Sequence, residues 1–401
     1  MRTCIRGDRV LLDGRLISSD LHLDYADGEG TIVDGRNASD ADTVIDATGL
    51  LVLPGLVDIH GDAFERQIEP RPGVAFPLEL ALLETDRLLL SYGISTAYHG
   101  VTWSWEPGLR GTENALAMLE TTERLRPNLG CDTRYHLRHE TFNLDAEETI
   151  IDWLRAGRIG CLAFNDHMSG TIKDLERASK VARMVERTGL SFEAFNALVD
   201  RTYARRDDVP QSIARIAAAA RGAGVTILSH DDRTESERAW FRELGARIAE
   251  FPMTETATQS AVAAGDVTVF GAPNVVRGGS HTGCPSAMDM VAAGWCSILA
   301  SDYNYPTLLN APFRIAAAGV LPIEEAWSLV SFNPAQALGL HDRGELAVGR
   351  RADVVLVDAE AVGGPVVVAT IANGRIRYLT DAERICGTAR STSRIGNTMS
   401  A

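Results

Sequence analysis

The composition is that of an ordinary globular protein. The chain has 401 residues, of which 45% are hydrophobic and 23% are charged, so it contains enough apolar residues for a large core. Its formal net charge of −15 argues against nucleic acid or an anionic membrane surface as a partner. No apolar run approaches the ~20 residues of a membrane span, and the N-terminus lacks the apolar stretch of a secretory signal. We therefore expect a cytoplasmic protein, and a homo-oligomer remains open.

The first 52 residues predict a small β unit. Segment 10–17 carries an Asp13-Gly14 pair between two apolar runs, which is the pattern of a β-hairpin. A second tight turn is predicted at Asp34-Gly35. Short strands separated by such turns do not form a large core alone, so we expect this unit to pair with another part of the chain.

Residues 53–341 alternate apolar runs with helical periodicity. This alternation predicts an α/β fold of parallel strands joined by crossover helices, most economically a (β/α)8 TIM barrel. A doubly wound open sheet is the alternative, and it is less favoured because no GxGxxG follows the first strand. The predicted helices include 78–92, 113–125, 146–156 and 172–187. The eight predicted strands are Leu53–His60, Ile94–His99, Thr133–Glu140, Ile159–Asp166, Val225–His230, Ala246–Phe251, Val267–Ala272 and Ser297–Asp302.

After residue 342 the β character returns, with apolar runs at 352–358, 366–371 and 374–379. The simplest assembly pairs residues 1–52 with 342–380 in one small β-sandwich, next to a metal-dependent barrel formed by 53–341. Residues 381–401 end in a stretch rich in Ser, Thr and Arg, and we expect them to form a disordered tail.

Residue types that bind metal ions collect where the predicted strands end. In a parallel barrel the active site lies at the carboxyl ends of the strands. A single histidine there is more often structural, and a single aspartate more often caps the next helix, which is the alternative for Asp231 and Asp232. The presence of histidines and carboxylates at five strand ends together favours a metal-dependent hydrolase instead. The candidates are His60, Asp62, Glu140, His167, His230 and Asp302, whereas His22, His99, His136 and His341 are interpreted as ordinary histidines.

Two segments resemble motifs of the amidohydrolase superfamily. Segment 53–62, which ends in His-Gly-Asp, is similar to its first metal motif, and 333–355, which begins Asn-Pro-Ala, is similar to its C-terminal signature. Within the superfamily the chain resembles the PhnM family, the triphosphate-cleaving enzymes of the carbon–phosphorus lyase pathway. The motifs that carry this resemblance are His60-Gly61-Asp62, Pro70-Arg71-Pro72, His136-Leu137-Arg138, Ser229-His230-Asp231-Asp232, the run from Gly271 to His281, and Ser301-Asp302-Tyr303.

The resemblance implies a hydrolase with two divalent metal ions. His60 and Asp62 would hold one ion, and His167 and His230 would hold the other. Asp302, counted among the ligands, would accept the proton of the attacking water as general base. Zinc is the first expectation for both ions, and manganese or iron would also suit these ligands.

The bridge between the two ions is expected to be Glu140. In many relatives a carbamylated lysine has this role, but the chain contains only two lysines, Lys173 and Lys180. Both follow the fourth predicted strand on a helical pattern, and neither ends a strand. A carboxylate must therefore replace the lysine, and Glu140 ends the third strand.

A small anionic phosphorylated substrate requires cationic side chains near the metal ions. Arginine suits phosphate because its planar guanidinium can donate to two oxygens at once. The resemblance implies hydrolysis of alpha-D-ribose 1-methylphosphonate 5-triphosphate, or a close analogue, to the 5-phosphate and pyrophosphate in phosphonate catabolism. The alternatives are an amidohydrolase that uses the same metals on a cyclic amide or N-acyl substrate, and a non-catalytic scaffold on the same fold. The expected substrate-binding residues are Arg71, Arg138, Arg277, His281 and Arg66.

Overall fold

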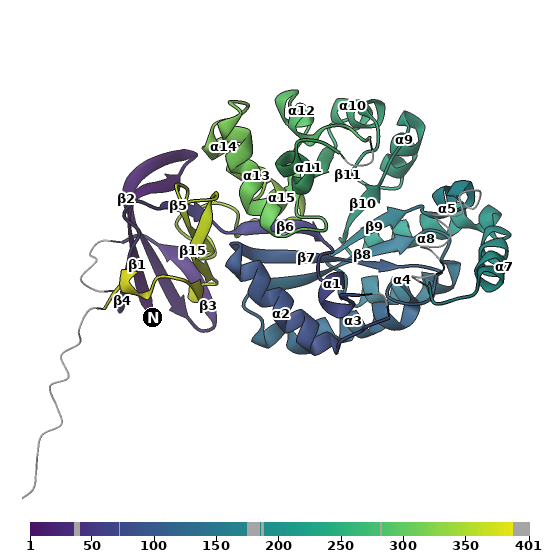
Figure 1. Cartoon of the computed structure of the whole chain (residues 1–401), viewed down its shortest axis with the longest axis horizontal. Helices are drawn as coiled ribbons and strands as arrows, with labels where there is room; N and C mark the ends of the chain where they lie inside the picture. The colour runs from purple at the N-terminus through teal and green to yellow at the C-terminus, as the bar shows by residue number, and fades with distance from the viewer. Residues whose placement is uncertain (36–40, 72, 175–184, 186–187, 281–282, 388–401) are drawn as a thin grey trace, which may run out of the picture. The chain divides into compact units, whose positions relative to one another are not determined.

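The computed structural model divides the chain into two compact units (Figure 1). Leu56–Gly344 form the larger unit, and Met1–Gly55 combine with the residues from Glu345 onward in the smaller one. The structure describes the chain except residues 36–40, 72, 175–184, 186–187, 281–282 and 388–401.

The larger unit is a (β/α)8 barrel. Its eight strands are parallel and are hydrogen-bonded in chain order from β6 to β13. A bridge between Gly61 and Asp302 joins the last strand to the first. All eight predicted strands are confirmed, with small shifts at their ends. They are β6 (Leu56–Gly61), β7 (Ile94–Trp103), β8 (Asp132–Glu140), β9 (Cys161–Asn165), β10 (Thr226–His230), β11 (Ile248–Glu250), β12 (Val267–Gly271) and β13 (Ile298–Ala300).

A buried carboxylate strengthens the seam between β13 and β6. Asp58 on β6 is completely buried. It accepts a hydrogen bond from the backbone N of Ser301 at 3.0 Å and another from the Ser301 hydroxyl at 2.5 Å. The two residues are 243 positions apart in the chain. Their pairing fixes the end of the first strand beside the end of the last.

The helices of this unit follow the strands and flank the sheet (Figure 1). The predicted helices at 78–92, 113–125 and 146–156 are confirmed as α2, α3 and α4, whereas most of the one predicted at 172–187 lies outside the described residues. The helices are α1 (Glu65–Ile68), α2 (Leu78–Ser91), α3 (Thr112–Leu125), α4 (Glu147–Arg155), α5 (Met168–Asp174), α7 (Phe192–Tyr203), α8 (Val209–Gly222), α9 (Glu235–Glu243), α10 (Glu255–Ala263), α11 (Ala272–Arg277), α12 (Ala287–Ala292), α13 (Pro306–Ala317), α14 (Ile323–Ser328) and α15 (Phe332–Ala337).

Two of the apolar clusters in the barrel unit include residues of its strands. One cluster includes Ile59, Leu228 and Val269 from the strands themselves. The other includes Leu119 on α3 and Trp153 on α4, which pack with the strands that these helices cover. Burial of apolar surface contributes about 25 cal/mol per Å². The resulting scaffold is rigid, so residues at the strand ends have fixed positions.

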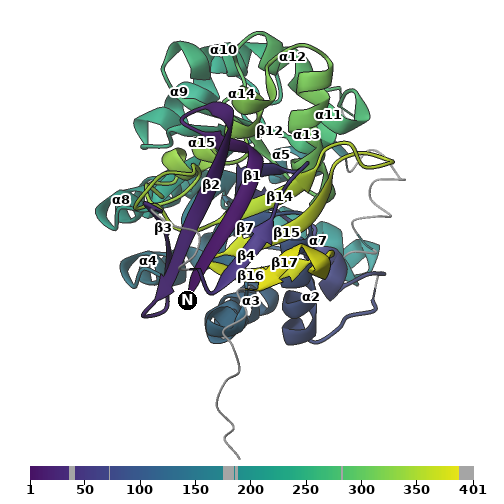
Figure 2. The same cartoon turned by 90° about the vertical axis from the view of Figure 1, so that its left-hand side faces the viewer.

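The smaller unit is a β-sandwich built from both ends of the chain (Figure 2). The Asp13-Gly14 hairpin is confirmed, since both residues have positive φ and β1 pairs antiparallel with β2. β5 pairs antiparallel with β14, which joins the two ends, and one apolar core includes residues from both. The nine strands are β1 (Arg2–Leu12), β2 (Arg15–Ala26), β3 (Glu29–Val33), β4 (Thr43–Asp46), β5 (Leu51–Pro54), β14 (Val354–Asp358), β15 (Val366–Ala372), β16 (Arg375–Leu379) and β17 (Ile385–Gly387).

The prediction of a disordered tail from residue 381 is wrong at its start. Ala382–Arg384 form a short 3-10 helix, and β17 pairs antiparallel with β4. Backbone hydrogen bonds to an existing strand edge explain this order. The remainder of the predicted tail, 388–401, lies outside the described residues. Among the described residues, no helix is both long and apolar enough to cross a membrane.

Candidate active site

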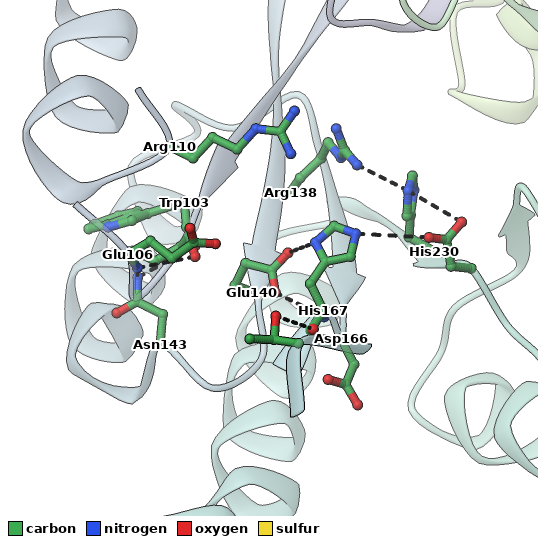
Figure 3. A network of polar contacts seen from close by, with 12 residues as sticks. Trp103, Glu106, Arg110, Arg138, Glu140, Asn143, Asp166, His167 and His230 are labelled. Atoms are coloured by element: carbon green, nitrogen blue, oxygen red, sulfur yellow. Dashed lines mark hydrogen bonds and ion pairs between the residues drawn. The ribbon is translucent and has the colours of Figure 1, made fainter. Parts of the chain in front are cut away.

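The predicted site residues lie at the carboxyl ends of the barrel strands. Glu140 and His230 are the last residues of β8 and β10, and His60 is next to the last residue of β6. His167 and Asp302 lie two residues beyond β9 and β13. Figure 3 shows Glu140 in contact with His167, and Arg138 in contact with His230 beside them. Parallel strands of a barrel end at the same rim, and this explains why residues far apart in sequence meet here.

The seam of the barrel brings His60, Asp62 and Asp302 together. The backbone N of Asp302 donates to the carbonyl of His60 at 2.9 Å, and the backbone N of Asp62 donates to the carbonyl of Asp302 at 2.9 Å. Asp302 has a φ of 55°, in the left-handed region that Asp adopts more readily than most residues. One ligand atom from each of the three side chains lies within 4.8 Å of the other two. This spacing suits a divalent ion.

Glu140 and His167 form a close pair. Their Oε1 and Nδ1 atoms are 2.5 Å apart, and the backbone N of His167 donates to Oε2 of Glu140 at 3.2 Å. Burial opposes ionisation of Glu140, but the charge and hydrogen bonds of His167 outweigh it and lower the pKa of the carboxyl to about 2. His230 does not converge with this pair to within 4.8 Å, as His60, Asp62 and Asp302 do with one another. The expected second ligand group is therefore only partly assembled.

Arg138 places a guanidinium inside the group of candidate ligands. It precedes Glu140 by two residues on β8 and therefore points to the same side of the strand. Its Nη1 donates to Oδ2 of Asp62 at 3.2 Å, and its Nη2 donates to Nε2 of His230 at 3.1 Å. The side chain is almost completely buried. Arg138 therefore joins two residues that the sequence assigned to different metal ions.

Glu250 is a central residue that the sequence reasoning missed. It is the last residue of β11 and is completely buried. Its Oε2 accepts a hydrogen bond from Nδ1 of His230 at 2.7 Å, and its Oε1 is 2.8 Å from Nδ1 of His60. His136, interpreted from sequence as an ordinary histidine, has its Nε2 3.9 Å from Oε2 of the same carboxylate. The available signal was a carboxylate at the end of the predicted strand Ala246–Phe251.

Three aspartates near the centre have different surroundings. Burial raises the pKa of Asp302 to about 7, with a further contribution from the charge of Asp62. Asp231 lies 3.6 Å from Nε2 of His230 and 3.9 Å from Nε2 of His167, at the rim of the site. Asp232 faces away and accepts hydrogen bonds from Arg238 at 3.0 Å and from Ser229 at 2.5 Å. Asp232 thus has a structural role in the turn after β10.

A cavity of about 250 Å³ opens above these residues. His60, Arg138, His230 and Asp302 line its floor, and Gly279, Ser280, Arg277 and Tyr303 are among the residues of its wall. Nη1 of Arg277 donates to the hydroxyl of Tyr303 at 3.2 Å. The guanidinium of Arg66 lies 5.9 Å from the centre of the Tyr303 ring, so it reaches the same wall from outside.

Comparisons with known proteins show which sequences this chain resembles. A profile of the amidohydrolase family matches residues 193–378. The chain is 29% identical over 367 residues to alpha-D-ribose 1-methylphosphonate 5-triphosphate diphosphatase of Escherichia coli, covering 88% of this chain and 94% of the relative. These two matches support a place in the amidohydrolase superfamily. The chain is also 25% identical to imidazolonepropionase of Mycolicibacterium smegmatis, covering 92% of this chain and 98% of the relative.

Solved structures share the fold of this chain. The barrel and sandwich superpose on a Xaa-Pro dipeptidase with a TM-score of 0.62 at 12% identity, covering 95% of this chain and 100% of the other. At that identity the likeness concerns the fold alone.

The donor atoms of the site fit a divalent metal ion. Imidazole nitrogens and carboxylate oxygens are ligands that zinc, manganese and iron accept. His60, Asp62 and Asp302 converge within the required distance, and so do His60, His136 and Glu250. Nδ1 of His60, Nε2 of His136 and Oε1 of Glu250 are buried and have no hydrogen-bond partner among the described residues. Such atoms are costly unless a cation satisfies them.

The structure separates the predicted substrate-binding residues. Arg138 and Arg277 line the cavity, and Arg66 contacts its wall through Tyr303. Arg71 is exposed and lies outside the cavity lining. His281 lies outside the described residues.

Proposed function

We propose that this protein hydrolyses alpha-D-ribose 1-methylphosphonate 5-triphosphate, or a close analogue, to the 5-phosphate and pyrophosphate. The observation that carries the proposal is the presence of two arginines, Arg138 and Arg277, on one cavity with Asp302 and the candidate metal ligands. The similarity to the diphosphatase of Escherichia coli over 88% of the chain supports the substrate class.

The cationic groups of the cavity would bind the oxygens of the triphosphate. Arg277 stands on the wall, where its guanidinium reaches Tyr303 and keeps donors for a ligand. Arg138 stands on the floor, held by Asp62 and His230. A bidentate arginine binds phosphate strongly because each N–H carries part of the charge. This arrangement favours an anionic substrate over a neutral amide.

Asp302 would act as the general base. Its carboxylate lines the cavity next to the candidate metal ligands, so it could accept a proton from the attacking water and return it to the leaving phosphoryl oxygen. Divalent ions held by the neighbouring histidines and carboxylates, two of them and zinc in the first instance, would supply Lewis-acid activation of water and stabilise charge on the phosphoryl group. His60, Arg138 and His230 are buried, and their low exposure to water strengthens these electrostatic interactions.

The experiment is a product assay on the full chain loaded with zinc or manganese. The substrate is alpha-D-ribose 1-methylphosphonate 5-triphosphate, and release of pyrophosphate is followed by a coupled enzymatic assay, with the 5-phosphate identified by phosphorus NMR. We expect pyrophosphate and no orthophosphate, because the bond between the α and β phosphates is cleaved. ATP is the control for a triphosphate without the phosphonate.

An amide hydrolase is the second candidate, favoured by the similarity to imidazolonepropionase over 92% of the chain. It predicts cleavage of a cyclic amide or N-acyl compound by the same protein sample and no pyrophosphate from the triphosphate. A scaffold without activity predicts neither product, and measurement of both products decides among the three.

A further inference from the structure

Three buried ligand atoms converge below the floor of the cavity. They are Nδ1 of His60, Nε2 of His136 and Oε1 of Glu250, and each has no hydrogen-bond partner among the described residues. The three side chains come from β6, β8 and β11, and each is at most 1% exposed. One ligand atom from each lies within 4.8 Å of the other two. An unpaired buried polar atom costs about 1–3 kcal/mol, so three in one place require an explanation.

The surrounding hydrogen bonds direct the lone pairs into this space. Nδ1 of His136 is 3.0 Å from the carbonyl of Ile59, which accepts only, so this nitrogen carries the proton and Nε2 carries a lone pair. Oε2 of Glu250 accepts from Nδ1 of His230, which leaves Oε1 for another partner. A backbone carbonyl or a carboxylate that orients a ligating imidazole is typical of metal sites in proteins.

The distances suit a metal ion better than a hydrogen bond. Nδ1 of His60 and Oε1 of Glu250 are 2.8 Å apart but lack the angle of a hydrogen bond. Nε2 of His136 is 3.9 Å from Oε2 of Glu250. Ligand atoms of a tetrahedral zinc site lie about 3.4 Å apart, given bonds of about 2.1 Å. A proton between two of these atoms would leave the third unsatisfied, whereas one cation satisfies all three.

We propose that His60, His136 and Glu250 bind a divalent metal ion in the floor of the barrel. This deep site has two imidazoles and one carboxylate as protein ligands, and His60 connects it to the cavity above. The proposal rests on the proposed function in one respect, namely that the protein is a metal-dependent hydrolase. It assigns ligand roles to His136 and Glu250.

If the ion occupies the deep site, Asp62 and Asp302 are not among its ligands. His60 belongs to both converging groups, and its Nδ1 faces Glu250. When this nitrogen binds the ion, Asp62 remains paired with Arg138, and Asp302 remains a base at the cavity. The ion then depends on His136 and Glu250 and not on Asp62.

Two conservative variants test the ligand roles. His136→Asn keeps a donor near Nδ1 for the carbonyl of Ile59 and removes Nε2, and Glu250→Gln keeps an acceptor for His230 and removes the charge. His139→Asn is the matched control, because His139 is a completely buried histidine of the same strand whose ring packs against Phe164.

Zinc per chain is counted by elemental analysis of the full-length protein, and its affinity is measured by competition with a chelator. We expect His136→Asn and Glu250→Gln each to lose one ion per chain or to bind it more than about 100-fold more weakly, since loss of an outer partner alone costs about 10- to 100-fold. His139→Asn should keep this ion. Wild-type ion content and affinity in both test variants would overturn the proposal.

A crystal of the wild-type protein grown with zinc provides the readout that needs no variant. We expect an anomalous peak about 2.0–2.2 Å from Nδ1 of His60, Nε2 of His136 and a carboxylate oxygen of Glu250. A peak at Asp62 and Asp302 with none at His136 would overturn the deep site. If zinc lay at Asp62 and Asp302 and the protein still released pyrophosphate, the deep site would be wrong and the proposed function would stand. If zinc lay at His136 and no pyrophosphate were released, the proposed function would be wrong and the deep site would stand.

Discussion

Replacement of Asp302 by Asn is the sharpest test of the proposed chemistry. The substitution keeps the shape of the side chain and removes its capacity to accept a proton. The backbone of Asp302 is fixed by hydrogen bonds to His60 and Asp62, and Asn adopts a φ of 55° as readily as Asp, so the seam should remain closed. General-base catalysis contributes about 10²- to 10⁴-fold, equal to about 3–5 kcal/mol of transition-state stabilisation. We therefore expect kcat to fall by this factor while the metal content is unchanged.

The assay measures kcat, KM and metal content on the same preparation of each variant. Asp231→Asn is the matched control, because Asp231 also lines the cavity and also has a positive φ of 63°. It should retain kcat within about tenfold, since it is not placed as the base. If Asp302→Asn kept a comparable kcat, the assignment of Asp302 as general base would be wrong, and loss of metal would instead mark it as a ligand.

Three further changes test the cavity, the scaffold and the metal. Arg277→Met should lower kcat/KM by about 10- to 100-fold, since hydrogen bonds to charged groups contribute about 1.5–3 kcal/mol. Arg233→Met, at a residue outside the lining of the cavity, should lower kcat/KM by less than about fivefold. Equal losses of kcat/KM in the two variants would contradict a substrate-binding role for Arg277. Arg238→Met should lower the free energy of unfolding by about 3–5 kcal/mol, because it leaves Asp232 buried without its arginine partner. Arg158→Met, which breaks the partly exposed pair with Glu123, should lower it by at most about 1 kcal/mol. Urea titration that ranked these two variants equally would refute the argument. Dialysis against a chelator should lower the melting temperature, since a ligand at 100 times its Kd stabilises the folded state by about 2.7 kcal/mol. A melting temperature that calorimetry finds unchanged would argue against bound metal.

The barrel could be predicted from the sequence because its strands are short apolar runs between helical patterns. The run that ends in His60 and the run that ends in Glu140 both become parallel strands. Parallel strands end at one rim, so the chemistry of their last residues could also be predicted. The approach of Asp302 to His60 follows from the same rule, because the last strand of a barrel must pair with the first.

The deeper part of the site could not be predicted in the same way. Glu250 ends a strand of three residues, and nothing in its local sequence distinguishes a buried carboxylate from one that caps a helix. His136 lies four residues before the end of β8, where a histidine is usually structural. Arg138 was expected to face the substrate, but its contacts with Asp62 and His230 depend on three strands meeting in space. Only the tertiary structure reveals such contacts.

The seam between β6 and β13 has a consequence for biosynthesis. The hydrogen bonds from Ser301 to Asp58 join positions 243 residues apart, and Asp302, the proposed base, follows Ser301 directly. During translation the first motif leaves the ribosome long before its partner strand exists, so the nascent barrel has an open edge through most of its synthesis. Contacts of such long range make folding slow. Every truncated product that stops before β13 lacks both the hydrogen bonds that close the barrel and the proposed base, so we expect an unfinished chain to have no partial activity.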